Sequence, residues 1–384
     1  MPWLETDPMN EKVKFIAAYL NNKETISALC KRFNISRRTG HKYINNYNLN
    51  GIEGLKERSR APHTQANRID SEVEKSILNI KAHYPRWGAK KILKKIEQDH
   101  ADIQWPARST IDDLLKKHGL VMPRKRRRQV PPYTEPLIHC KKPNDVWSID
   151  YKGQFPLGNK ELCYPLTITD NYSRYILGIN GTKGISSKIT KKILIDIFSE
   201  FGLPKAIRSD NGVPFAGNSL GGLSPLAIWF IKLGIVPERI RKGHPQENGR
   251  HERMHFTLKQ ETASPSQYNY QKQQNSFDKF RNMFNEERPH EGIDFNRPAW
   301  LYKSSKRAYN EKLKPVEYDT ALCEVRLVRP NGHIKWQGKE IFISKLLAGE
   351  PIALRPCSSE EWILYFSFLP LGVFKEKTCK MDKI

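Results

Sequence analysis

Residues 144–153 read NDVWSIDYKG, and the prediction of the fold starts from this stretch. Its β-branched, aromatic and apolar residues predict a β-strand, yet the strand carries a carboxylate, Asp150, with apolar neighbours on either side. A carboxylate in such a place is either a costly burial or a metal ligand at a polar edge of the strand. What Asp150 does therefore depends on the strands and helices that surround it.

The region from residue 144 to about residue 300 alternates between strand-like and helix-like runs. The expected strands lie in DVWSIDYKGQF (145–155), ELCYPLTITDNYSRYILGING (161–181), PKAIRSDNG (204–212) and GIVPERI (234–240), and the expected helices in KITKKILIDIFSEF (188–201) and PLAIWFIKLG (225–234). Three strands come close together, followed by helix, strand, helix, strand and helix. This order predicts a mixed α/β sheet with helices on its faces, occupying residues 144–305.

Two further carboxylates stand where such a fold gathers functional groups. Asp210 follows the strand AIRSD at the turn Asn211-Gly212, and Glu252 lies in the helical stretch GRHERMHFTLKQE. Two strand carboxylates and one from a facing helix can hold two Mg²⁺ ions, the arrangement that serves in-line phosphoryl displacement. The alternative is a capping or turn role, which is the preferred interpretation of Asp170 in TITDNYSRY.

Four blocks of this chain resemble those of bacterial insertion-sequence transposases. The resemblance lies in NDVWSIDYKG (144–153), IRSDNGVPFA (207–216), HPQENGRHERMHFTLKQE (244–261) and the tail signature FNEERPHEGIDFNRPAWLY (284–302). The N-terminal PWLETDPMNEKVKFIAAYL (2–20) and LCKRFNISRRTGHKYINNY (29–47) resemble the helix-turn-helix end of the same proteins. The resemblance implies a DDE transposase with a retroviral-integrase-type core and a ribonuclease H-like fold.

Carried onto this sequence, the resemblance implies catalytic and metal-binding roles for Asp150, Asp210 and Glu252, with two Mg²⁺ or Mn²⁺ ions expected. The implied activity is cleavage at the 3′ ends of an insertion sequence and strand transfer into target DNA. Double-stranded DNA and further copies of the chain, assembled on that DNA, are the implied partners. A DNA-binding protein that no longer cleaves, or a nuclease of the same fold without strand transfer, is the alternative function.

The third carboxylate has a rival in Glu247, which precedes Asn248-Gly249. The spacing from Asp210 to Glu252 is longer than the family usually has, and Glu247 fits that spacing better. The extra residues fall in AGNSLGGLSPLAIWF (216–230), whose glycines and Ser-Pro suit a loop insertion, and loop length is cheap to vary. We therefore prefer Glu252, which matches the local motif.

The charge of the chain predicts a polyanionic partner. Lys and Arg number 65 against 41 Asp and Glu, a formal net charge of +24, and cations placed on phosphates release condensed counterions. No apolar run is long enough for a spanning helix, and no basic amphipathic helix or lipidation motif favours a membrane. Six scattered cysteines without a CxxC pair argue against zinc and disulfides and suit a reducing cytoplasm. The resemblance to insertion-sequence transposases implies a bacterial cytoplasm, with the protein on the nucleoid.

The N-terminal region predicts two helical DNA-binding units, at residues 1–60 and 61–122. In the first, Ser36 is expected to cap a recognition helix, and a linker at 123–143 carries a dense basic run. The expected DNA contacts are Arg37, Arg38, Thr39, His41 and Lys42 in the helix, Arg124, Lys125, Arg126, Arg127 and Arg128 in the linker, and Lys259 beyond Glu252. An ordinary helical hairpin and a solvated charge run are the alternatives. Residues 315–384 hold strand-like runs joined by short turns, and we expect a small β-barrel there.

Overall fold

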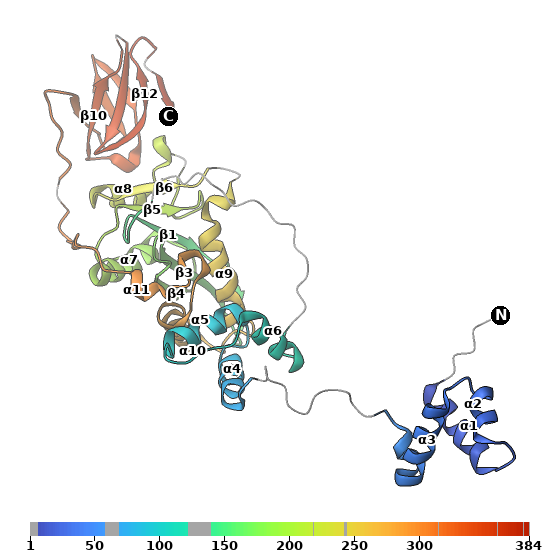
Figure 1. Cartoon of the computed structure of the whole chain (residues 1–384). Helices are drawn as coiled ribbons and strands as arrows, with labels where there is room; N and C mark the ends of the chain where they lie inside the picture. The colour runs from blue at the N-terminus through green and yellow to red at the C-terminus, as the bar shows by residue number, and fades with distance from the viewer. Residues whose placement is uncertain are drawn as a thin grey trace. The chain divides into compact units, whose positions relative to one another are not determined.

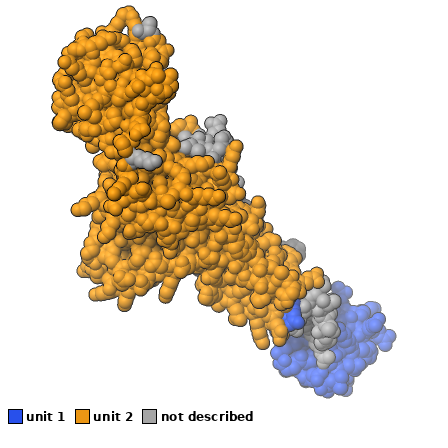
Figure 2. All heavy atoms as spheres, turned by 90° about the vertical axis from the view of Figure 1, so that its left-hand side faces the viewer, with its two compact units in different colours: residues 1–70 blue, residues 71–384 orange. Residues whose placement is uncertain are grey.

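The computed structural model describes residues 7–57, 69–121, 140–217, 219–241, 244–313, 315–358, 360–378 and 380–383. The chain divides into two compact units, Met1–Asp70 and Ser71–Ile384 (Figures 1 and 2). The five basic residues predicted to contact DNA in the linker, Arg124 to Arg128, lie outside the described residues. Among the residues that are described, no helix is both long and apolar enough to cross a membrane. The finer domain boundaries stay predictions.

Unit 1 is a three-helix domain with a helix-turn-helix, as predicted. Its helices are α1 (Pro8–Leu20), α2 (Ile26–Arg32) and α3 (Arg37–Asn50), followed by the short 3₁₀ helix η1 (Gly51–Leu55). Each helix begins at a side-chain cap, provided in order by Asp7, Thr25 and Ser36. Apolar residues of all three helices and of η1 share one small core.

The tight crossing of α2 and α3 depends on a glycine. A Cβ atom at Gly40 would lie 2.5 Å from the Sγ atom of Cys30, a distance that no packed pair tolerates. Gly40 therefore lets the recognition helix approach α2 closely, and the exposed start of α3 is held by the Ser36 cap.

Three more helices precede the sheet in unit 2: α4 (Ser71–His83), α5 (Ala89–Asp99) and α6 (Arg108–Lys117). The last of these, α6, begins at Arg108 with Ala107 at the cap position and no side-chain cap bond, so Ser109 lies inside the helix. The helices contact the tail of the core, since Gln98 donates a hydrogen bond of 2.7 Å to the carbonyl of Phe295.

The core sheet has the predicted mixed topology (Figure 1). Its strands are β1 (Val146–Tyr151), β2 (Phe155–Pro156), β3 (Leu162–Asp170), β4 (Ile176–Thr182), β5 (Ala206–Ser209) and β6 (Val236–Arg239). Strand β3 pairs antiparallel with β1, β2 and β4, whereas β1, β5 and β6 form a parallel series. The two antiparallel hairpins followed by two parallel strands are the arrangement of a ribonuclease H-like sheet.

Helices cover both faces of this sheet. On one face α7 (Ser187–Phe201) and α8 (Pro225–Lys232) pack against apolar side chains of β1, β3 and β5. On the other face α9 (Gly249–Thr262) and α10 (Tyr270–Asn282) pack against β3 and β4. The sheet is therefore the middle layer of a sandwich, with α9 as the helix that faces the candidate site.

The C-terminal region forms an open sheet, so the predicted small β-barrel is not confirmed. Its strands are β7 (Glu324–Leu327), β8 (His333–Trp336), β9 (Lys339–Phe342), β10 (Pro351–Pro356), β11 (Glu361–Phe366), β12 (Leu369–Lys375) and β13 (Lys380–Lys383). Five of them pair in the order β13-β12-β11-β10-β7, while β8 and β9 form a separate hairpin. Within the described part of the chain, no ladder joins the two edges of the five-stranded sheet.

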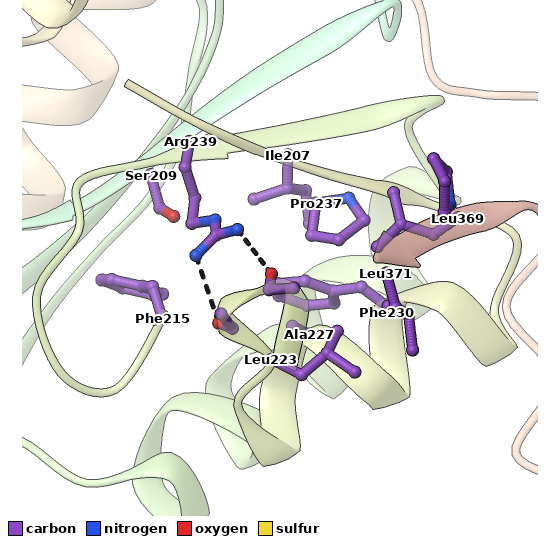
Figure 3. A pocket seen from close by; sticks show the side chains of 13 residues that line it. Ile207, Ser209, Phe215, Leu223, Ala227, Phe230, Pro237, Arg239, Leu369 and Leu371 are labelled. Atoms are coloured by element: carbon purple, nitrogen blue, oxygen red, sulfur yellow. Dashed lines mark hydrogen bonds between the residues drawn. The ribbon is translucent and has the colours of Figure 1, made fainter. Parts of the chain in front are cut away.

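A shared apolar cluster joins this sheet to the core. Leu371 of β12 belongs to the same cluster as Leu223 and Ala227 at the start of α8. Figure 3 shows Arg239 reaching across to the loop before α8, where its guanidinium donates to the carbonyls of Gly221 and Gly222. The Arg239 bonds and the cluster together fix the long loop that follows Asp210.

A buried ion pair between neighbouring parallel strands gives a test of the core. Arg208 and Glu238 are register partners on β5 and β6, and the Arg208 Nε donates to Glu238 Oε2 at 2.6 Å with both side chains 8% exposed. Arg208→Met should cost about 3–5 kcal/mol because it leaves a buried carboxylate without its cation. The double variant R208M/E238L should recover most of that loss in urea unfolding followed by tryptophan fluorescence. Equal losses in the two variants would show that the pair is not coupled.

Candidate active site

Strand alternation directs Asp150 toward α9. The side chains of Trp147 and Ile149 belong to the cluster beneath α7 and α8. Because successive residues of a strand face opposite sides, Ser148 and Asp150 face the α9 side. Asp150 is directly opposite Thr167 in the β1–β3 ladder, so a polar strip lies on this face of an otherwise apolar sheet.

Parallel pairing brings Asp210 to the same edge. Ser148 of β1 is the register partner of Arg208 of β5. Two residues further along each strand come Asp150 and Asp210, and parallel neighbours end at the same edge of a sheet. Asp210 Oδ1 accepts a hydrogen bond of 3.0 Å from the Gly212 amide, which fixes the side chain at the start of the turn. The predicted turn role of Asn211-Gly212 is thus to orient this carboxylate.

Glu252 lies on α9, the helix that covers the face of the sheet to which Asp150 points. It lies exposed in the first turn of α9, whose buried face carries His251 and His255. Burial, together with the negative charges of Asp210 and Glu252, raises the pKa of Asp150 from its ordinary value of 3.8 to about 7. Carboxylates crowded in this way are stabilised by a cation, so the donor set fits a hard divalent metal ion.

The rival carboxylate serves a different purpose. Glu247 accepts hydrogen bonds from the backbone amide of Arg241, at 2.7 Å, and from its Nε, at 2.6 Å. Although burial opposes ionisation, these two bonds lower the pKa of Glu247 below its ordinary value. Its side chain is 1% exposed, and its bonds to Arg241 join the two ends of the loop between β6 and α9. This geometry favours Glu252 as the third carboxylate.

Two histidines were missed by the sequence analysis. His251 and His255 are one helical turn apart on the buried face of α9, and burial lowers the pKa of both, that of His251 to about 3. Both Nε2 atoms contact the hydroxyl of Thr167, at 2.7 and 2.6 Å. The signal in the sequence was the i, i+4 spacing of HERMH beside Glu252, which puts both rings on one helix face.

Asp170 has the structural role that we preferred. Its two carboxylate oxygens accept hydrogen bonds from the amide of Asn144, at 2.8 Å, and from the amide and hydroxyl of Ser173, at 2.8 and 2.6 Å. The residue is completely buried, so it organises the turn between β3 and β4 and the entry to β1.

The residues predicted to contact DNA differ in their surroundings. Arg37, Arg38, His41 and Lys42 are exposed along the first turns of α3. Thr39 differs from them, because its amide donates to Ser36 Oγ at 3.1 Å and its hydroxyl lies 2.8 Å from the same atom. The Thr39 hydroxyl is therefore occupied with capping. Lys259 is exposed on α9, two turns beyond Glu252 and on the same face.

A second group of cations was not foreseen. Burial, together with the nearby charges of Arg288 and Arg253, lowers the pKa of Lys91 on α5 to about 7. The Arg288 Nε is buried without a hydrogen-bond partner among the described atoms. Three cations from α5, α9 and the tail thus lie close together, partly offset by Glu261 and Glu291.

Comparison with known families defines the class of protein. Residues 141–245 and 233–298 match two families described as integrase core domains. Residues 11–63 match a helix-turn-helix domain family, and residues 39–115 match a homeodomain-like domain family. The chain therefore carries an integrase core domain, ribonuclease H-like in its sheet order, behind N-terminal DNA-binding domains.

Individual relatives narrow this class. The chain is 27% identical over 188 residues to the insertion element IS407 31.7 kDa protein of Burkholderia multivorans, covering 48% of this chain and 65% of that protein. It is 31% identical over 127 residues to the insertion element IS476 39.2 kDa protein of Xanthomonas euvesicatoria, covering 33% and 35% of the two chains. Together with the domain matches, these relatives confirm the predicted resemblance to insertion-sequence transposases. The chain spans less than two thirds of the length of both relatives.

Among solved structures, the HTLV-2 integrase catalytic core domain in complex with magnesium is similar to this chain. The match covers 43% of this chain and 100% of that domain, with 16% identity and a TM-score of 0.34.

The raised pKa of Asp150 predicts a pH-dependent stability of the metal-free protein. Its folded-state pKa of about 7 lies above its ordinary value of 3.8. The neutral carboxyl therefore stabilises the fold at low pH, and this contribution is lost as the pH rises through about 7. Asp150→Asn keeps a neutral side chain at every pH, so the amount by which its Tm exceeds that of the wild type should be much larger at pH 8 than at pH 5. Melting curves in EDTA test this, and an equal difference at both pH values would contradict the raised pKa.

Proposed function

We propose that this chain is a DDE transposase, which binds the terminal inverted repeats of an insertion sequence, cleaves at its 3′ ends and transfers those ends into target DNA. The observation that carries the proposal is the placement of Asp150 and Asp210 at neighbouring parallel strands and of Glu252 on the facing helix, with burial and the charges of the other two carboxylates raising the pKa of Asp150 to about 7. The integrase core domain and the insertion-element relatives support it.

In this proposal the three carboxylates hold the metal ions from two adjacent strand ends and one helix. A pair of divalent ions bound there would activate the attacking oxygen and stabilise the leaving one. In the first step water attacks the phosphorus at the element end and a 3′-hydroxyl leaves. In the second step that hydroxyl attacks a target phosphodiester, and the target strand's own 3′-oxygen leaves. Both steps are phosphoryl transfers at one site, so one set of carboxylates suffices for both.

DNA binding is assigned to three surfaces. The exposed side chains of Arg37, Arg38, His41 and Lys42 at the start of α3 are placed to reach base edges, as recognition helices do. Lys259 continues the face of α9 that carries Glu252 and suits a phosphate near the site. The cations Lys91, Arg253 and Arg288 offer a second phosphate contact, since an anion relieves their mutual repulsion.

The reaction also requires more than one copy of the chain. Two element ends must be joined to one target, so we propose that the transposase forms a homo-oligomer on DNA, acting on the nucleoid in a bacterial cytoplasm. The competing function is a nuclease of the same fold, which would produce nicks and no joined products.

Substitution of the carboxylates tests the chemistry. Asp150→Asn, Asp210→Asn and Glu252→Gln should each lower cleavage and strand transfer by at least about 100-fold, because each removes a charge that stabilises the transition state through the metal. Binding of element ends in a gel shift should stay within a few-fold of the wild type.

Glu247→Gln is the matched control for Glu252→Gln. Because Glu247 bonds Arg241, its substitution should lower Tm while joined products still form. Full strand transfer by the Asp150→Asn protein would contradict the proposal, and loss of chemistry in Glu247→Gln with wild-type activity in Glu252→Gln would reverse the assignment. Nicks without joined products in the wild type would favour the nuclease.

Two cation variants separate recognition from phosphate binding. Lys259→Ala should weaken binding equally for element ends and unrelated DNA, and should reduce the slope of log K against log salt by about 1. Arg38→Ala should cost about 1–3 kcal/mol on element ends and less on unrelated DNA. Fluorescence anisotropy over a salt series measures both effects. An equal loss on both DNAs for Arg38→Ala would remove it from base recognition.

A further inference from the structure

The strongest unexplained feature of unit 2 is the buried histidine pair under the carboxylates. Asp150, His251 and His255 each offer one ligand atom, and these atoms lie within 4.8 Å of one another. The carboxylates alone suffice for the proposed chemistry, so the function does not explain why two imidazoles are buried against the same aspartate. Hydrogen-bond counting shows which of their nitrogens are occupied.

The hydroxyl of Thr167 fixes the tautomers of both rings. It donates its only hydrogen to the carbonyl of Asp150 at 3.1 Å, because a carbonyl can only accept. It must therefore accept from both imidazoles, whose Nε2 atoms lie 2.7 Å away for His251 and 2.6 Å for His255. A hydroxyl has one donor and two acceptor sites, so these three bonds use it completely. Both neutral rings then carry their hydrogen on Nε2 and a lone pair on Nδ1.

The two Nδ1 lone pairs have different surroundings. That of His251 accepts from the hydroxyl of Thr169 at 2.8 Å, so His251 has no free ligand atom. That of His255 faces the carboxylate of Asp150, with Nδ1 3.8 Å from Oδ2. A hydrogen bond is not formed there, because a distance of 3.8 Å is too long for one. Two lone pairs that face each other repel unless a cation lies between them.

We propose that His255 Nδ1 is a ligand of the divalent metal ion held by Asp150, so that this site combines one nitrogen with its carboxylate oxygens and favours Mn²⁺ over Mg²⁺. The inference rests on the proposed function, which makes Asp150 a metal ligand. With metal–ligand bonds of about 2.1 Å, two adjacent ligand atoms of an octahedral ion lie about 3.0 Å apart, so the observed separation of 3.8 Å needs about 0.8 Å of closure.

The arrangement around His255 is the one that metal-binding histidines have. Such a ring donates its other N–H to a fixed acceptor, which sets the tautomer and orients the ligand nitrogen. Here that acceptor is Thr167, which is completely buried and held by the backbone of Asp150. Imidazole suits transition-metal ions, whereas Mg²⁺ prefers oxygen ligands, and this difference sets the expected order of affinity.

The test is electron spin-echo spectroscopy of Mn²⁺ bound to the full-length protein, with histidine labelled as ¹⁴N or ¹⁵N. We expect an imidazole nitrogen coupling that changes with the isotope in the wild type. Glu and Asp cannot produce this signal, and the measurement needs neither DNA nor catalysis. His255→Gln should abolish the coupling and lower Mn²⁺ affinity about tenfold or more in calorimetry, with a smaller change for Mg²⁺.

His251→Gln is the matched control, because it changes the neighbouring ring of the same network and should leave the coupling in place. Bound Mn²⁺ without a nitrogen coupling in the wild type would overturn the inference and leave the carboxylate site standing. A coupling that survives in His255→Gln, or that disappears only in His251→Gln, would also overturn it. Failure of the wild type to bind Mn²⁺, with Asp150→Asn indistinguishable from it, would overturn the metal site of the proposed function as well.

Discussion

Because β1 and β5 run side by side in the same direction, whatever follows their last registered pair meets at one edge of the sheet. In this chain both strands continue into an aspartate, Asp150 and Asp210, two residues beyond the pair of Ser148 and Arg208. Burial, together with the repulsion between these carboxylates, raises the pKa of Asp150. The parallel pairing thus creates an electrostatic cost that a bound cation removes, and the rest of the site is arranged around it.

The helix α9 links this edge to the hydrophobic core. Its buried face packs Met254 and Leu258 against β4 and α10, and the same face carries the histidines over the polar strip of the sheet. The exposed face of its first turn carries Glu252. Since one rigid helix carries both sets, its apolar packing determines where Glu252 stands relative to the aspartates. The packing of the hydrophobic core therefore also sets the geometry of the site.

The sequence predicted those features that depend on local pattern. The strands of the core, the aspartates at strand ends and the capping of α3 by Ser36 followed from alternation, turn residues and helix caps. The C-terminal strands were also foreseen, but not their pairing, because whether a sheet closes depends on its twist and register rather than on the composition of its strands. The bond between the Thr39 hydroxyl and the capping Ser36 side chain was missed, although Ser36 was predicted as the cap.

The histidine network was outside the reach of sequence reasoning for a different reason. The spacing of His251 and His255 places them on one helix face, but their chemistry depends on Thr167, which is far away in the chain and meets them only because α9 packs on β3. A single hydroxyl then decides which nitrogen of each ring carries a hydrogen. Glu247 was a rival of Glu252 because the sequence does not show that the carboxylate of Glu247 accepts hydrogen bonds from Arg241, and only the fold does. In both cases the residue type can be read from the sequence, but its hydrogen-bond partner is set by tertiary contact. At this site that partner determines the role of each residue.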